Sequence, residues 1–231
     1  MTTDTTVTEG AVGTAYHGCR TRLTALLADI DRSQAQTPVP TCPGWAVHDV
    51  LAHVSGGVVD AINGRMEGAG TDPWTARQVN ERRELSIAEI LDEWTMHASR
   101  VEPLLDTAGD LGRQAVADVA SHEHDIRTAL HQPGARWTDA IEIGLTFAAA
   151  RLVEAADTHG NSLRVESSGM VFGPDDADVT LRGDPFELLR AITGRRSLGQ
   201  IRQLAWEGDV ERVIPAFWWY GLHPATEDIE E

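Results

Sequence analysis

Apolar residues recur at helical spacing through the first two thirds of the chain. A spacing of three or four residues, which places side chains on one face of a helix, is kept by Leu23, Leu26, Leu27 and Ile30. The prolines of "TPVPTCPG" at 37–44 end this helix, because proline cannot continue one. Further helices are predicted over 45–64, from Ser86 onward, over 113–134 and over 138–160. Together they predict a helical bundle over residues 11–160.

After Gly160 the pattern changes to the alternation that is typical of strands. "SLRVES" and "ADVTLRG" alternate in this way, and "DPFELLRAITG" follows as a helix. Asp184 is the expected N-cap of that helix, Pro185 its first residue and Glu187 the partner that closes a capping box. The fold class is therefore mainly α, with a small α+β domain over 161–231. A module of this size needs to pack on the bundle to be stable.

Charge and composition exclude several classes of partner. The chain carries a net charge of −17, and its 19 basic residues are all arginine. Such a charge repels phosphate backbones and anionic lipid, so neither nucleic acid nor a membrane is an expected partner. Chemistry that depends on lysine is excluded as well. The polar N-terminal segment "MTTDTTVTEGAVG" lacks the pattern of a signal peptide, and we expect the protein to be cytoplasmic.

The stretch "ADVASHEHDIRTAL" at 117–130 concentrates groups that bind metals or protons. On a helical wheel, Asp118, His122 and Asp125 share one stripe beside the apolar face, whereas His124 points away from it. Glu123 falls near the centre of the apolar face and is a competing candidate ligand. An acid and a histidine four residues apart on a helix can bind one metal ion. The alternative for any helix histidine is that it is simply packed in the core or exposed to solvent.

A third ligand must come from another helix. His53, in "DVLAHVSG", lies on the flank of its predicted helix, and Asp49 one turn earlier is the expected partner of its second ring nitrogen. Two histidines and one carboxylate leave coordination positions open, which is the pattern of catalytic zinc sites and also suits iron. Cys19 and Cys42 lie far apart without CxxC spacing, and each is expected to be a reduced, buried thiol.

The segment "TPVPTCPGWAVHDVLAHVSG" resembles the mycothiol-dependent maleylpyruvate isomerase family, within the DinB-like metalloenzymes. That family has a T-P-x-P-x-C-P-G-W-like turn, then a helix with D-x-x-x-H, and later a helix with E-x-x-x-H-x-x-D. Asp49 and His53 match the first helix, and Asp118, His122 and Asp125 match the second. The resemblance extends loosely to "DVTLRGDPFELLRAITGRR", "WEGD" and "FWWYGLHP", and so covers about residues 15 to 222.

The resemblance implies a DinB-like four-helix bundle whose metal ligands are His53, Asp118 and His122. It further implies a divalent metal, with zinc expected, and mycothiol as the thiol cosubstrate that attacks a small-molecule electrophile. The reaction would be an S-transfer or a maleylpyruvate-type cis-trans isomerisation. The chain departs from the family at Asp118, where glutamate is usual, so a shorter side chain must reach the metal. The alternatives are a non-catalytic, metal-free binding protein on the same scaffold and a metal-dependent hydrolase. The oligomeric state is open, a homodimer included.

Several other charged residues have simpler expected roles. Arg82 and Arg83 predict a solvated face, with a clamp for a substrate carboxylate as the alternative. Arg195 and Arg196 follow a helix end and are expected to complement its dipole, although the family resemblance leaves open that an arginine of this module reaches the active cleft. His48, like His97, is expected at the surface.

Overall fold

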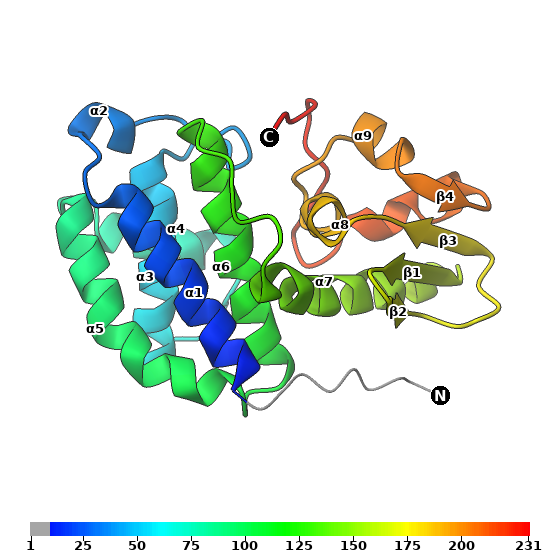
Figure 1. Ribbon diagram of the computed structural model, residues 1–231, viewed down its shortest axis with the longest axis horizontal. Coiled ribbons are helices and arrows are strands. Elements are labelled where there is room, and N and C mark those ends of the chain that lie inside the picture. Colours follow the sequence, from blue (N-terminus) through cyan, green and yellow to red (C-terminus); the bar gives the residue numbers. More distant parts are fainter. Residues whose placement is uncertain (1–9) are drawn as a thin grey trace.

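Four helices form the bundle that the sequence predicts. The computed structural model describes residues 10–231 and contains, as the bundle, α1 (Ala11–Leu27), α3 (Val47–Ile62), α5 (Ile87–Leu105) and α6 (Asp110–Ala129). Figure 1 shows them side by side, and each packs against at least two of the others. Most of the N-terminal segment, in which no signal peptide is expected, lies outside the described residues.

Local capping explains where α5 begins. Ser86 accepts a hydrogen bond from the backbone of Glu89, and the Glu89 carboxylate accepts one from the backbone of Ser86, so the predicted capping box is confirmed. Two short helices, α2 (Arg32–Ala35) and α4 (Asp72–Glu81), lie in the connections. The wheel-based prediction did not separate α4 from the connector, yet α4 packs on α3 and supplies residues to the site described below.

Helix α7 (Asp139–Thr158) joins the bundle to the C-terminal module. It packs on α6 on one side and on α8 (Pro185–Ile192) on the other, as Figure 1 shows. Gly144 makes this contact close: a Cβ atom there would lie 3.1 Å from Cα of Ala117 and 3.3 Å from Cδ2 of Leu189. Asp184 caps α8 as predicted. The predicted closing of its capping box by Glu187 is wrong, because that carboxylate pairs with Arg196 instead.

A small mixed sheet forms the rest of the module. Its strand order is β2-β1-β3-β4, with β1 and β3 parallel and the other two pairs antiparallel. The alternating patterns predicted β1 (Leu163–Ser167) and β3 (Val179–Arg182). They missed β2 (Met170–Phe172) and β4 (Ala205–Glu207), because three residues are too few to show an alternation. Helix α9 (Leu198–Arg202) and two 3₁₀ turns, Val210–Arg212 and Ile214–Phe217, complete the module.

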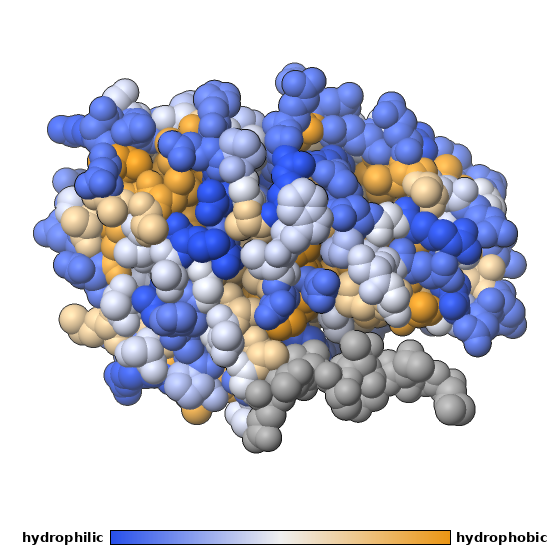
Figure 2. Space-filling model, in the orientation of Figure 1, coloured by the Kyte–Doolittle hydropathy of each residue, from blue (hydrophilic) through white to orange (hydrophobic). Residues whose placement is uncertain are grey.

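One hydrophobic core runs from α1 through the bundle to the second 3₁₀ turn. Because this core includes residues on both sides of residue 160, it does not mark a domain boundary there. The division of the chain into domains at 11–160 and 161–231 stays a prediction. Figure 2 shows that hydrophilic side chains cover much of one face of the molecule, as the strong negative charge leads one to expect. Among the residues from 10 onward, no helix has both the length and the apolar character that a membrane crossing requires.

Candidate metal centre

The structure brings together the three side chains that the sequence singled out. His53 projects from α3, and Asp118 and His122 project from consecutive turns of α6. Oδ1 of Asp118 lies 3.5 Å from Nε2 of His122 and 3.7 Å from Nε2 of His53. The two imidazole rings meet edge to face with their centroids 5.1 Å apart. Both imidazoles are buried, whereas the side chain of Asp118 is 49% exposed.

The spacing of these donor atoms suits a small cation. Two ligand atoms in a tetrahedral site, each about 2.1 Å from the metal, lie about 3.4 Å apart. The two nitrogen–oxygen distances of this centre are close to that value, and its three donor atoms lie within 4.8 Å of one another. Aspartate therefore reaches both imidazoles in place of the longer glutamate. Two surface hollows, of about 390 and 230 Å³, lie elsewhere. The half-exposed side chain of Asp118 opens this centre to solvent.

A buried carboxylate orients the ring of His122. Nδ1 of His122 lies 3.0 Å from Oδ2 of Asp125, which is fully buried on the same helix. Two arginines of the C-terminal module hold Asp125 in turn: Arg190 at 2.8 Å and Arg195 at 2.7 Å. Carboxylates in this position fix the orientation of a metal-binding histidine and increase its basicity. Arginines of the C-terminal module therefore do reach the site, because Arg190 and Arg195 contact Asp125, the carboxylate that orients His122. Arg195 thus does more than complement a helix dipole.

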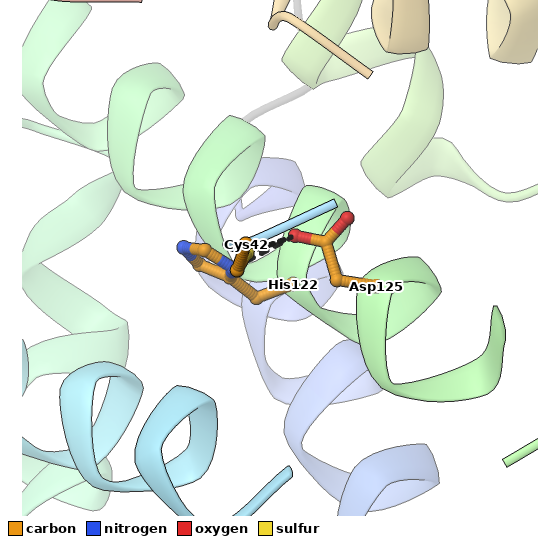
Figure 3. A group of neighbouring side chains, drawn as sticks. All are labelled: Cys42, His122 and Asp125. Carbon is orange, nitrogen blue, oxygen red and sulfur yellow. Dashed lines mark hydrogen bonds and ion pairs between the residues drawn. The ribbon is translucent and has the colours of Figure 1, made fainter. Parts of the chain in front are cut away.

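A second group of potential ligands, Cys42, His122 and Asp125, lies next to the first. Figure 3 shows the thiol and the imidazole both facing the carboxylate of Asp125, and Sγ of Cys42 donates to Oδ2 over 3.4 Å. The charge of Asp125 is already matched by two arginines. This group is therefore a support for His122. The expectation of a buried thiol is wrong for Cys42, which is only half-buried and donates a hydrogen bond to Asp125, whereas Cys19 is fully buried as predicted.

His53 has a different partner from the predicted one. Its Nδ1 atom lies 2.7 Å from Oε1 of Gln78, which α4 supplies. Asp49 accepts a hydrogen bond from the backbone of Ala46 instead, because it stands at the third position of α3, where a carboxylate can reach back to cap the helix. Trp45 and Trp74 flank the imidazole, with ring centroids 5.4 and 6.0 Å from it.

The other two candidates in the α6 cluster do not face this centre. Glu123 is buried and pairs with Arg22 at 2.6 Å and Arg127 at 3.0 Å, so its role as a competing ligand is not supported by the geometry. His124 packs edge to face on Phe186 of α8, with ring centroids 4.6 Å apart. The wheel placed it away from the apolar face, yet the side chain is buried, because α8 packs against that part of α6.

Two expectations about surface residues are wrong. Arg82 is buried, and its guanidinium lies 2.5 Å from Glu93, so only Arg83 belongs to a solvated face. His48 is also buried, and its Nε2 atom lies 2.8 Å from the carbonyl oxygen of Leu85. In both cases the polar side chain is buried because it pairs with a group on another segment: Glu93 of α5 for Arg82, and the connection at Leu85 for His48. A helical wheel of one helix cannot show such a partner.

The charges of the centre reinforce one another. Desolvation opposes the ionised form of Asp118, yet the neighbouring charge of His122 lowers the pKa of this carboxyl. Burial likewise opposes the protonated form of His122, yet Asp118 and Asp125 raise its pKa. The pKa of Asp125 is lowered, since its arginines outweigh the effect of burial. A cation that binds here must therefore displace a proton from His122.

Comparisons with known proteins agree with this architecture. The family model described as the mycothiol maleylpyruvate isomerase N-terminal domain matches residues 16–156. A crystal structure of the mycothiol-dependent maleylpyruvate isomerase superposes with a TM-score of 0.52 at 14% identity, over 84% of this chain and 92% of that one. A histidine-to-alanine mutant of that enzyme gives the same values. A search of curated proteins found no significant match. The fold is a DinB-like four-helix bundle with a small α+β module, and the chain belongs to the mycothiol maleylpyruvate isomerase N-terminal domain family.

Proposed function

We propose that the protein is a metal-dependent enzyme that activates mycothiol for attack on an electrophilic small molecule. The observation that carries this proposal is the meeting of His53, Asp118 and His122 at an edge that Asp118 opens to solvent. The family to which the chain belongs supports the choice of thiol. Two imidazoles and one carboxylate favour zinc, and they leave room for a fourth ligand.

A bound divalent metal would lower the pKa of a coordinating thiol and hold it as the thiolate, which is the reactive form. The chain itself would supply the rest. His53, Asp118 and His122 would hold the ion, and Asp125 would keep the ring of His122 in place. Trp45 and Trp74 would exclude water from the flanks of His53.

Two outcomes of the thiol attack are chemically open. In a cis-trans isomerisation, the thiolate forms a C–S bond at one end of a double bond conjugated to a carbonyl, and the electron pair moves onto the carbonyl oxygen. The remaining single bond rotates, the electron pair returns to re-form the double bond, and the C–S bond breaks to release the thiolate. In an S-transfer the C–S bond stays: either a leaving group such as halide departs with its electron pair, or the addition product takes up a proton from solvent. We propose a cytoplasmic site of action, because the thiol must be kept reduced.

The test compares thiol-dependent turnover in metal-free and zinc-loaded protein. We expect zinc-loaded protein to isomerise maleylpyruvate, or to consume mycothiol with an alkylating probe such as a haloalkyl fluorophore. Metal-free protein and His122→Ala should do neither. No turnover and no thiol binding by the loaded protein would remove the proposal. Turnover that does not depend on thiol would favour the metal-dependent hydrolase, and protein that never binds zinc would favour the binding protein.

A further inference from the structure

A buried polar network lies behind His53, on the side away from Asp118. Gln78 is fully buried on α4, and its side chain bridges two groups of α3. Its Oε1 atom lies 2.7 Å from Nδ1 of His53, and its Nε2 atom donates to Oδ2 of Asp60 over 2.8 Å. Nothing in the spacing of the sequence indicates this bridge, because Gln78 is 25 residues from His53.

The orientation of the Gln78 amide follows from its neighbour Asp60. This carboxylate is fully buried and lies 2.7 Å from Arg65 and 2.9 Å from Arg77. It forms ion pairs with both arginines, and a carboxylate in an ion pair only accepts hydrogen bonds. The amide must therefore present its NH₂ group to Asp60 and its carbonyl oxygen to His53. The ion pairs of Asp60 thus determine which atom of the Gln78 amide is oxygen and which is nitrogen, a choice that the atom positions alone leave ambiguous.

The amide orientation in turn determines which ring nitrogen of His53 carries hydrogen. A carbonyl oxygen accepts, so Nδ1 of His53 must be the donor. In the neutral ring the lone pair then lies on Nε2, the atom 3.7 Å from Asp118. A histidine binds a metal through such a lone pair, and the partner of its other nitrogen selects the tautomer.

We infer that Gln78 is a positioning residue that holds His53 in the Nδ1–H tautomer, so that Nε2 is ready to bind the cation. This inference deepens the proposed function and rests on it for the role of Nε2. The two imidazoles of the centre then have unlike supports: a neutral amide behind His53 and a carboxylate behind His122. Asp60 and its arginines act on the centre only through Gln78.

The packing of α4 on α3 is shaped to admit this side chain. Gly56 of α3 faces Gln78, and a Cβ atom at that position would lie 2.6 Å from Cβ of Gln78 and 2.9 Å from Nη1 of Arg82. Such distances are too short for any side chain, so glycine is required where the two helices meet. Gly56, the first glycine of "HVSGG", therefore lets α4 approach α3 closely enough for Gln78 to reach His53.

The test reads the tautomer directly in metal-free protein. ¹⁵N spectra of the histidine rings at alkaline pH should show His53 with hydrogen on Nδ1. Gln78→Leu should shift the ring toward the Nε2–H form and lower zinc affinity about 10–100-fold, the usual effect of losing such a support. The double variant Gln78→Glu with Asp60→Asn keeps an acceptor facing Nδ1, and it should restore both the tautomer and most of the affinity.

Arg82→Met is the matched control for packing. It removes a buried polar side chain from the end of the same helix. It breaks the Arg82–Glu93 ion pair and the hydrogen bond from Arg82 to the backbone carbonyl of Gln78, but it leaves the Gln78 side chain and His53 in place. We expect it to lower thermal stability but to leave the tautomer unchanged. A wild-type ring with hydrogen on Nε2, or a tautomer that ignores Gln78→Leu, would overturn the inference. Wild-type protein that shows the expected tautomer but binds no zinc would count against the proposed function alone.

Discussion

Nδ1 of His122 lies 3.0 Å from Oδ2 of Asp125, and neither residue has more than a trace of exposed surface. Asp125→Asn should therefore lower zinc affinity about 10–100-fold, because the ring loses its anionic partner. The same change leaves Arg190 and Arg195 without their buried counter-charge, and it should cost about 3–5 kcal/mol of unfolding free energy. Zinc titration and urea unfolding measure the two effects. Asp92→Asn, at an exposed position on α5, should change neither.

His53→Ala and His122→Ala should each abolish tight zinc binding, because each removes one of only three donors. Elemental analysis of purified protein after growth with added zinc measures this. His159→Ala, at an exposed position after α7, should bind zinc like the wild type. Both site histidines are buried, so a small loss of thermal stability is expected as well. Full zinc content in either variant would show that the metal is held elsewhere.

Helical periodicity predicted the part of this centre that lies on a single helix. Asp118 and His122 are four residues apart on α6, and a wheel places such pairs correctly because their spacing is local. Periodicity does not tell which helices pack together, so His53 entered through its flank position and the family motif. Gln78, Asp60 and Arg190 were missed, because their roles depend on contacts between elements far apart in the chain.

The errors have physical causes of the same kind. Asp49 was assigned to His53 by spacing, but the free backbone N–H at the start of α3 competes for its carboxylate. Glu123 was placed near the core, correctly, but a wheel cannot show that Arg22 of α1 and Arg127 of its own helix neutralise it there. Helical periodicity predicts the direction in which a side chain leaves its helix. Which group that side chain then contacts depends on how the helices pack together.

Glu123→Leu should leave the zinc content unchanged, because the carboxylate faces Arg22 and Arg127 on another side of α6. Stability should fall by about 2–3 kcal/mol, less than the loss expected for a fully buried pair, since both guanidiniums reach solvent. Metal analysis together with thermal unfolding separates the two quantities. A variant that loses zinc while staying folded would restore Glu123 as a ligand.

Asp118→Asn should lower zinc affinity at least about tenfold with little change in stability, because half of this side chain is exposed to solvent. Asp118→Glu introduces the residue that the family usually has, and it should keep the site able to bind, since half of the side chain at this position faces solvent. Chelator competition measures both affinities. Equal affinity in the wild type and in Asp118→Asn would contradict a direct contact between this carboxylate and the metal.

His124 makes the stability of the protein depend on pH. Burial first, and then the charge of Arg190, lower the pKa of His124 to about 4. In the unfolded chain its pKa is about 6.5. Above that pH both states are neutral and the residue has no effect on the pH dependence. As the pH falls from about 6.5 toward 4, the unfolded state binds the proton first, so stability falls by about 3 kcal/mol in total.

His124→Leu should remove this acid-dependent loss, because leucine cannot bind a proton in either state. The exchange is tolerable, since Nε2 of His124 is buried without a hydrogen-bond partner in the described part of the chain and the ring rests on Phe186. The variant should therefore resemble the wild type near neutral pH and gain on it steadily as the solution is acidified. Urea unfolding across that range measures the difference. His159→Leu, at an exposed position, should follow the wild-type curve, and equal acid sensitivity in all three proteins would show that His124 titrates normally in the folded state.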